Sequence, residues 1–253
     1  MKAIVLGSGS KGNSTLLMGS NKILLIDVGF SYPKMKMLLE NYNCNPEEIN
    51  AILITHTHKD HINGLASFVK KNHVKVYANE KLYVELLKVI NDEDLILVDN
   101  EFNIGNLDIQ TIKTSHDSDG SVGFIIENNT KSIVYITDTG YLNQKSLKKI
   151  INKNLYIMES NHDVEMLMNG PYPYILKQRV LSDKGHLSNE LAGTYLRDVI
   201  GIDTKKIVLA HLSETNNCEE IAINTNKEII GEKLENIELL VALQDTSLDL
   251  GEV

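Results

Sequence analysis

The feature that most restricts the fold of this chain is a cluster of metal-binding residue types that directly follows an apolar segment. Residues 51–54 predict a short buried strand, and His56, His58, Asp60 and His61 follow it within a few residues. Side chains alternate along an extended strand, so His56 and His58 project to the same side, while Asp60 and His61 begin a turn into a helix. We therefore predict that this loop binds two metal ions, with His56 and His58 on one ion and Asp60 and His61 on the other.

The rest of the chain is predicted to alternate short strands with helices, without a linker or a repeat. The first three apolar runs predict antiparallel strands with a hairpin turn at residues 19–21, and later runs alternate with amphipathic segments, as in an α/β protein. Helices are expected at residues 32–42, 45–48, 63–71, 80–90, 144–151, 172–181, 189–199 and 219–230. Strands are expected at residues 3–6, 14–18, 22–27, 51–55, 74–77, 121–126, 132–137, 154–158, 206–209 and 237–241, with others between 90 and 114. This pattern predicts one compact domain with two sheets and outer helices.

Composition places the chain among ordinary globular proteins. Hydrophobic residues make up 42% and charged residues 23% of its 253 residues, which argues against disordered, collagen-like and coiled-coil proteins. The apolar runs are far shorter than the roughly 20 residues of a membrane helix, and the first of them is too short for a signal peptide. The two cysteines, Cys44 and Cys218, indicate no disulfide framework. We expect a cytoplasmic protein without a membrane partner.

A glycine-rich segment near the N-terminus imitates a dinucleotide-binding motif. Gly7, Gly9 and Gly12 fit G-x-G-x-x-G after a strand, and Asp27 stands where an acidic residue would contact a ribose. A Rossmann unit needs a crossover helix next, but only nine residues separate Gly12 from Lys22, and they predict a strand and a turn. We therefore expect no dinucleotide cofactor. The loop either contacts a substrate phosphate through its backbone amides or is a simple hairpin turn.

Four further residues of ligand type each follow a strand-like run: Asp27, His116, Asp138 and His211. The segment HTHKDH, from His56 to His61, matches the H-x-H-x-D-H signature of the metallo-β-lactamase superfamily, which also has an Asp, a lone His, an Asp and a final His in this order. The whole chain thus resembles that superfamily. The resemblance implies a four-layer αβ/βα sandwich with metals at the sheet edges, formed by a single hydrolase domain over residues 1–253 without an inserted domain.

The resemblance also assigns the metal ligands. They are His56, His58 and His116 for the first ion, Asp60, His61 and His211 for the second, and Asp138 as the bridge. Asp27 is expected to orient the histidine loop without touching a metal. Imidazole and carboxylate ligands suit Zn, Mn or Fe, and the sequence does not choose among these metals.

Two later motifs indicate which branch of the superfamily the chain resembles. Nuclease and tRNA-processing members pair a Glu with a later His that protonates the leaving group, and Glu159 in ESNHD and His186 in GHLSN resemble that pair. Together with GSGSKGNS, ITDTGY and AHLSETNN, these motifs resemble the YycJ/WalJ (VicX-like) family of DNA exonucleases linked to mismatch repair. The resemblance implies a two-metal phosphodiesterase that degrades double-stranded DNA from the 5′ end. In the reaction that we expect, a hydroxide shared by the two ions attacks phosphorus. His186 is the general acid, and Glu159 raises the pKa of His186. Asp60 is expected to be a catalytic residue as well as a metal ligand.

The sequence leaves several alternatives open. A thioester or lactone hydrolase can use the same metals without His186, and a regulatory metal-binding module needs no reaction. The formal charge of −9 argues against a broad DNA-binding face, so we expect weak, salt-sensitive DNA binding centred on the metals. Further residues have both a DNA-contact and an ordinary structural interpretation: His162, Lys177, Arg179 and Lys184 near the His186 loop, and Tyr172 and Tyr174, for which core packing is favoured. The lysines at 145, 148, 149 and 153 have helical spacing, which is typical of a solvent-exposed helix face. His73 is expected at the surface.

Overall fold

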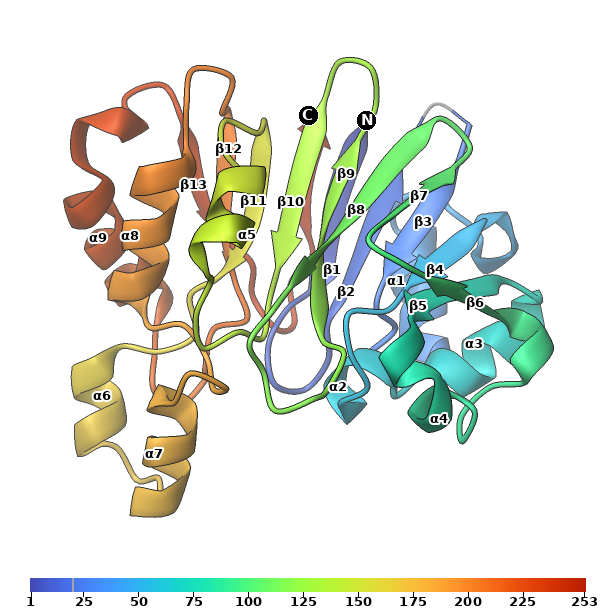
Figure 1. Ribbon diagram of the computed structural model, residues 1–253, viewed down its shortest axis with the longest axis horizontal. Helices are drawn as coiled ribbons and strands as arrows, with labels where there is room; N and C mark the ends of the chain where they lie inside the picture. Colours follow the sequence, from blue (N-terminus) through green and yellow to red (C-terminus); the bar gives the residue numbers. More distant parts are fainter. Residues whose placement is uncertain (20) are drawn as a thin grey trace. The chain divides into compact units, whose positions relative to one another are not determined.

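The computed structural model describes residues 1–19 and 21–253, which divide into two compact units (Figure 1). The first unit comprises Met1–Thr111, Ser118–Val122 and Leu243–Val253, and the second comprises Ile112–Asp117 and Gly123–Ala242. None of the helices in the described residues combines the length and the apolar character needed to cross a lipid bilayer.

The first unit contains a sheet of seven described strands in the order β14-β1-β2-β3-β4-β5-β6. Their bounds are β1 (Lys2–Gly7), β2 (Ser14–Met18), β3 (Ile23–Ile26), β4 (Ala51–Leu53), β5 (Lys75–Asn79), β6 (Leu95–Val98) and β14 (Leu248–Glu252). β14, β1, β2 and β3 pair antiparallel, whereas β3, β4, β5 and β6 run parallel. The segment after Gly12 is the strand β2, as predicted, and not a crossover helix. Ser20, in the predicted hairpin turn, lies outside the described residues.

Helices pack on this sheet through an apolar stripe. They are α1 (Tyr32–Glu40), α2 (Lys59–Ile62), α3 (Leu65–Asn72) and α4 (Tyr83–Leu86), with 3₁₀ helices η1 (Pro46–Glu48), η2 (Glu80–Leu82) and η3 (Asp92–Asp94). Met35 and Leu39 recur at helical spacing in α1 and are buried with Phe68 of α3 against Ile52 and Val76 of the sheet. This core fixes the parallel strands β3 and β4, whose carboxyl ends carry Asp27 and the histidine loop.

The second sheet has the order β13-β12-β11-β10-β9-β8-β7 in the described residues. Its strands are β7 (Glu101–Ile104), β8 (Leu107–Lys113), β9 (Val122–Glu127), β10 (Ser132–Ile136), β11 (Leu155–Glu159), β12 (Lys206–Ala210) and β13 (Glu238–Val241). β7 and β9 pair antiparallel with their neighbours β8 and β10, while β10 through β13 run parallel. Parallel strands end at the same sheet edge, so Asp138 beyond β10, Glu159 at the end of β11 and His211 after β12 share one edge.

Helices of the second unit are α5 (Gln144–Lys149), α6 (Val164–Asn169), α7 (Tyr174–Leu181), α8 (Asn189–Val199) and α9 (Glu219–Ile230), followed by the 3₁₀ helix η4 (Gly231–Leu234). Leu196 of α8 and Ala222 of α9 are buried with Tyr156 and Met158 of β11 in one apolar cluster. Within this unit, α6 and α7 form a helical pair that projects beyond the strand ends (Figure 1). α7 leads directly into the segment that carries His186.

Three elements differ from the prediction. The segment between the strand expected at 154–158 and the helix expected at 172–181 contains α6, which was not predicted because its six residues are too few to show a helical period. The Asp163 side chain caps α6 by accepting from the Met166 amide at 2.7 Å. β14 was not predicted, because Leu248 and Leu250 give only a short alternation and the partner strand β1 lies at the other end of the chain. The helix expected at 80–90 is shorter, since it contains only η2, the single-turn α4 and a following turn.

Candidate metal-binding and catalytic site

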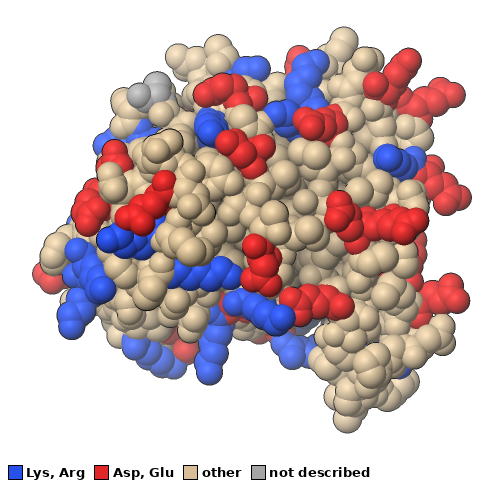
Figure 2. Space-filling model, turned by 180° about the vertical axis from the view of Figure 1, so that it is seen from behind, with Lys and Arg blue, Asp and Glu red and all other residues tan. Residues whose placement is uncertain are grey.

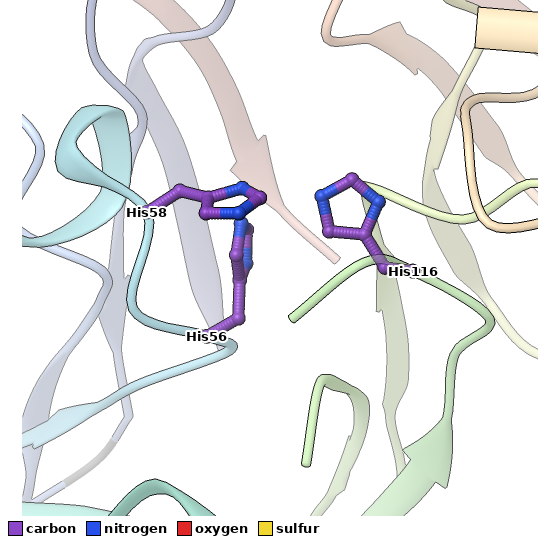
Figure 3. A group of neighbouring side chains, drawn as sticks. All are labelled: His56, His58 and His116. Atoms are coloured by element: carbon purple, nitrogen blue, oxygen red, sulfur yellow. The ribbon is translucent and has the colours of Figure 1, made fainter. Parts of the chain in front are cut away.

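The histidine loop of the first unit follows β4 and enters α2. Extended backbone at His58, the residue that precedes α2, turns the chain into the helix. The His56 and His58 rings lie edge to face with centroids 4.7 Å apart, and the His56 and His61 rings are 4.1 Å apart. Figure 3 shows that His56 and His58 come from this one loop, whereas His116 comes from the loop that follows β8. Three imidazoles are therefore concentrated at a single strand end.

Asp27 holds one of these imidazoles by a buried hydrogen bond. Its Oδ2 lies 2.7 Å from Nδ1 of His61, and it also accepts from the Thr55 hydroxyl at 2.8 Å, while Oδ1 accepts from the Thr55 amide at 2.9 Å. Burial raises the pKa of Asp27, against the lowering influence of His61 and Thr55. Because Asp27 engages Nδ1 of His61, a metal would be bound through Nε2, in place of the Asn13 amide that lies 3.0 Å from that atom. Asp27 therefore contacts the loop that it was expected to orient, and its role beside a metal stays a prediction.

Asn13 supports the same loop and was not predicted from the sequence. Its Nδ2 lies 3.2 Å from Oδ2 of Asp60 and 3.0 Å from Nε2 of His61, and its backbone amide donates to the Asp60 carbonyl at 2.8 Å. The backbone amide of Gly29 donates to the Asn13 carbonyl at 3.0 Å, and a Cβ on Gly29 would stand 1.9 Å from the Asp60 carbonyl oxygen. The glycine-rich loop therefore braces the histidine loop. The only advance signal was the position of this asparagine in GSGSKGNS, because side-chain amides follow no ligand spacing.

Two backbone amides of the glycine-rich loop already donate hydrogen bonds to side chains of the protein. The Gly9 amide donates to Oδ1 of Asn13 at 2.8 Å, and the Lys11 amide donates to Oε1 of Gln244 at 2.7 Å. Neither of these amides is available for a phosphate in this conformation. Of the two interpretations of this segment, the turn is the one that these contacts support.

The second unit gathers His116, Asp138 and His211 around one carboxylate. Nε2 of His211 lies 3.5 Å and Nε2 of His116 lies 3.8 Å from Oδ1 of Asp138. Nδ1 of His116 is 3.2 Å from the Gly185 carbonyl, which fixes its ring, and burial lowers the pKa of His116. All three side chains are nearly inaccessible to solvent. A neutral imidazole whose second nitrogen is held by an acceptor is the usual state of a metal-bound histidine.

Three residues of the site adopt backbone conformations that side chains usually avoid. Asp27 has φ 60°, Asp138 has φ 56° and His211 has φ 57°, and each directly follows or lies one residue beyond a strand of a parallel pair. Left-handed φ is uncommon for residues other than glycine and is concentrated at functional sites. The packing around the site therefore holds these residues against a local preference for another conformation.

Glu159 and His186 form a buried carboxylate–imidazole pair. Oε1 of Glu159 lies 2.7 Å from Nδ1 of His186 and 3.1 Å from Nδ1 of His211, and its Oε2 accepts from the Thr139 amide at 2.9 Å. Burial alone would raise the pKa of Glu159, but the charge and hydrogen bonds of the two histidines outweigh it and lower the pKa to about 2. Burial would lower the pKa of His186, but Glu159 outweighs it and raises that pKa. The pair thus favours a protonated His186.

The Glu159 pair is part of a larger cluster of ligand-type atoms. Asp138, Glu159, His186 and His211 offer oxygen and nitrogen atoms that all lie within 4.8 Å of one another. Asn161, which follows β11, donates from Nδ2 to the His211 carbonyl at 2.8 Å and so steadies the His211 loop. Asn161 was also absent from the residues predicted from the sequence. The second unit therefore contains both a set of metal-ligand types and an acid–base pair.

His162 is buried beside this cluster. Its ring is only 1% exposed, and in the part of the chain that the structure describes neither ring nitrogen has a hydrogen-bond partner. Burial lowers the pKa of His162 to about 4, so the ring is neutral near neutral pH. A substrate can touch this ring only if the side chains above it move.

The other residues considered as DNA contacts lie mainly on α7 and its neighbours. Arg179 is paired with Asp117, and Nζ of Lys177 donates to the Met168 carbonyl at 2.7 Å, so both cations have partners within the unit. Tyr174 is 71% exposed, so the favoured core-packing interpretation is wrong for this residue. The projecting α6–α7 pair, at the lower right in Figure 2, is almost entirely uncharged on the face shown. His73 is exposed as expected, and Cys44 and Cys218 are free thiols.

In this chain, parallel strands end beside histidine and carboxylate side chains that can bind metal ions, and a Glu–His pair lies next to them. This arrangement is that of a metal-dependent hydrolase. The chain belongs to the metallo-β-lactamase superfamily, because residues 22–212 match the beta-lactamase superfamily domain. The enzyme class expected from the sequence is thereby confirmed.

Relatives with similar sequences cover most of the chain. It is 41% identical over 228 residues to exodeoxyribonuclease WalJ of Streptococcus pneumoniae, which covers 87% of this chain and 85% of the relative. It is 38% identical over 234 residues to exodeoxyribonuclease YycJ of Bacillus anthracis, with 90% and 89% covered. The predicted resemblance to the YycJ/WalJ family is confirmed.

A solved structure confirms the fold class. The metallo-β-lactamase fold protein YhfI from Bacillus subtilis aligns with a TM-score of 0.75 at 17% identity, over 98% of each chain. At this identity the likeness shows the fold alone. Because the alignment covers 98% of this chain and 98% of the YhfI chain, the described residues contain no inserted domain, as expected.

Proposed function

We propose that this chain is a cytoplasmic two-metal exodeoxyribonuclease that removes nucleotides from the 5′ end of double-stranded DNA, in a step linked to mismatch repair. Two relatives that cover most of the chain are named exodeoxyribonucleases, which supports DNA as the substrate. The observation that carries the proposal is the Glu159–His186 pair, with 2.7 Å between its oxygen and nitrogen. Such a pair supplies a proton donor, which the unactivated sugar oxygen of DNA needs in order to depart.

The donor atoms of the chain fit a pair of divalent ions. Each of four imidazoles has its Nδ1 close to an oxygen, which leaves Nε2 for a metal: His56 beside Thr55 at 3.0 Å, His61 beside Asp27 at 2.7 Å, His116 beside Gly185 at 3.2 Å and His211 beside Glu159 at 3.1 Å. This is the outer contact that metal-bound histidines usually make. We assign His56, His58 and His116 to one ion, Asp60, His61 and His211 to the other, and Asp138 to both.

The ligand set is divided between the two compact units. The first unit contributes His56, His58, Asp60 and His61, and the second contributes His116, Asp138 and His211. Neither unit has the whole ligand set. We therefore propose that residues 1–253 act as one hydrolase domain.

The chemistry then divides between the ions and the protein. When bound, the two ions lower the pKa of a water toward neutrality and offset the negative charge that develops on the phosphoryl oxygens. Asp27 and Asn13 hold the histidine loop in position. Glu159 accepts from Nδ1 of His186, so Nε2 is the atom that passes a proton to the departing oxygen. The raised pKa of His186 keeps that proton in place near neutral pH.

End-labelled DNA tests the proposal directly. Purified protein is incubated with Mn²⁺ and duplex or single-stranded DNA labelled at the 5′ or the 3′ end, and the products are resolved by length. A 5′-labelled duplex should release labelled mononucleotide from the start, whereas a 3′-labelled duplex should shorten progressively. Internal cuts, or no cuts, would count against an exonuclease, and hydrolysis of thioesters alone would favour the small-molecule alternative. A duplex nicked beside a mismatch, degraded from the nick, would support the link to repair.

A further inference from the structure

Lysines gather on the helices that surround the histidine loop, although the chain as a whole has a formal charge of −9. α1, α2 and α3 carry five lysines and only two acidic residues, Glu40 and Asp60, and we have assigned Asp60 to a metal. The lysines are Lys34, Lys36, Lys59, Lys70 and Lys71. Figure 2 shows blue Lys and Arg side chains gathered at the lower left of the viewed face. We call these five residues the lysine band.

Two members of the band are held in place by aromatic rings. Nζ of Lys71 lies 4.2 Å from the centroid of the Tyr32 ring, and Nζ of Lys34 lies 4.3 Å from that of Phe30. The Tyr32 ring packs in turn on Phe68, with centroids 5.8 Å apart, which ties α1 to α3. A cation over an aromatic face is attracted to it and loses side-chain freedom before any ligand arrives. The band is therefore partly ordered in advance for an anionic partner.

Few carboxylates of the protein neutralise the charge of the lysine band. Lys34 pairs with Asp245 at 3.1 Å and Lys36 with Glu40 at 3.6 Å, and both acidic side chains are solvent-exposed. Exposed ion pairs of this kind contribute little to stability, so phosphate groups can replace the carboxylates. Lys70 and Lys71 lie in the last turn of α3, where the helix dipole favours cations.

The band also continues into the proposed active site. Lys59 is the first residue of α2 and stands in the chain between His58 and Asp60. A DNA strand with a phosphate at Lys59 would therefore lie beside the histidine loop. Spaced cations on a surface beside a hydrolytic centre fit the regularly spaced charges of a nucleic-acid backbone.

We infer that the lysine band is the track along which the phosphate backbone of duplex DNA approaches the active site. The inference rests on the proposed function and changes one expectation from the sequence, namely that attraction would be limited to the metals. The band positions DNA without reading its sequence, because phosphate contacts carry no base information. It acts on binding and not on the chemical step.

The test is a salt titration of DNA binding to the full-length, Mn²⁺-loaded protein. Binding of a fluorescent duplex with phosphorothioate linkages, which resist cleavage, is followed by anisotropy at several salt concentrations. The double variant Lys70→Gln/Lys71→Gln, and separately Lys36→Gln, should bind more weakly than the wild type. Each lysine that contacts a phosphate should reduce the slope of log K against log salt by about 0.9. The double variant should therefore lose close to two units of slope.

Lys145→Gln/Lys148→Gln on α5 of the second unit is the matched control, because it removes two exposed cations outside the band. It should keep the wild-type slope. Hydrolysis of bis(p-nitrophenyl) phosphate, a diester too small to follow the band, should be unchanged in all variants, which shows that they are folded and metal-loaded. Wild-type affinity and slope in the band variants, or an equal loss in the control, would overturn the inference. So would loss of binding to vesicles of anionic phospholipid with DNA binding retained.

The binding measurement separates this inference from the proposed function. If the band variants bind DNA normally and the wild-type protein degrades DNA from its ends, the DNA track is rejected and the proposed exonuclease function is kept. If the wild-type protein cleaves no DNA but the band variants show a reduced salt slope, the proposed exonuclease function is rejected and the lysine band is still a DNA-binding surface.

Discussion

Oδ2 of Asp27, which directly follows β3, lies 2.7 Å from Nδ1 of His61 in α2, and neither side chain is accessible to solvent. The contact joins residues 34 positions apart in the sequence. It fixes which nitrogen of His61 faces the proposed metal site, and it does so through a carboxylate that also accepts twice from Thr55. The orientation of the histidine loop therefore depends on a residue outside that loop.

Asp27→Asn should weaken metal binding without removing a ligand. The amide can still accept from Thr55, but it no longer offers a charged acceptor to His61. Loss of such an outer contact typically lowers metal affinity by about 10- to 100-fold. Equilibrium dialysis against Mn²⁺ or Zn²⁺ measures this change. Asp119→Asn, at an exposed side chain of the first unit, is the control, and equal affinities in the two variants would contradict the role of Asp27.

His186→Ala should separate substrates by their leaving groups. Removal of a general acid slows a reaction by about 10²- to 10⁴-fold when the leaving group needs a proton. Degradation of DNA should therefore fall by that amount, while hydrolysis of bis(p-nitrophenyl) phosphate, whose leaving group needs no proton, should remain near the wild-type rate. His73→Ala, at an exposed histidine, should change neither rate. Equal loss on both substrates with full metal content would remove the acid role of His186.

Glu159→Gln should shift the pH dependence of DNA degradation. Glu159 raises the pKa of His186, so the acid stays protonated to a higher pH than an ordinary histidine, and activity should fall as pH rises through that raised pKa. Without the carboxylate the pKa of His186 falls, and the alkaline loss of activity moves to lower pH. At a fixed pH above this pKa, the variant should therefore retain a smaller protonated fraction of His186 and a lower rate than the wild type. An unchanged profile would show that His186 is not the titrating acid.

The buried ring of His162 should make the protein sensitive to acid. Its pKa is lowered to about 4, below the ordinary 6.5, so the folded state binds its proton less tightly than the unfolded state does. This contribution is fully present above pH 6.5 and is lost as pH falls toward 4, by an amount on the order of 3 kcal/mol. His162→Asn should therefore lose less stability over this window.

Urea unfolding at several pH values measures the effect of His162, with a chelator present so that metal release does not contribute. His73→Asn is the control, because that ring is exposed. Parallel pH profiles for the wild type and His162→Asn would contradict the expectation.

The sequence predicted the site residues best where ligand types stand close together or directly after an apolar run. His56, His58, Asp60 and His61 could be proposed from the sequence because they occupy one loop, and Asp138 and His211 because each comes just after a buried strand. Asn13 was missed because its contacts with Asp60 and His61 depend on how two distant loops meet, and an asparagine in a glycine-rich turn has an ordinary explanation.

The fold was predictable where the hydrophobic period was long. The segment 219–230 has the predicted bounds of α9, since its twelve residues repeat the helical pattern. α6 is too short to show a period, and β14 exists because of its pairing with β1, which no local pattern reveals. The lysine band was not foreseen either, because its members are dispersed over three helices and are outweighed in a count of total charge.

The left-handed backbone at Asp138 and His211 has a consequence for selection experiments. Glycine adopts this conformation without strain, so replacing either residue by glycine should recover part of roughly 1 kcal/mol of strain. A library of this gene screened only for resistance to heat would therefore favour glycine at two positions whose side chains we propose as metal ligands. Selection for heat resistance favours glycine at these two positions, whereas the proposed metal binding requires Asp138 and His211. A useful screen must therefore measure both heat resistance and activity.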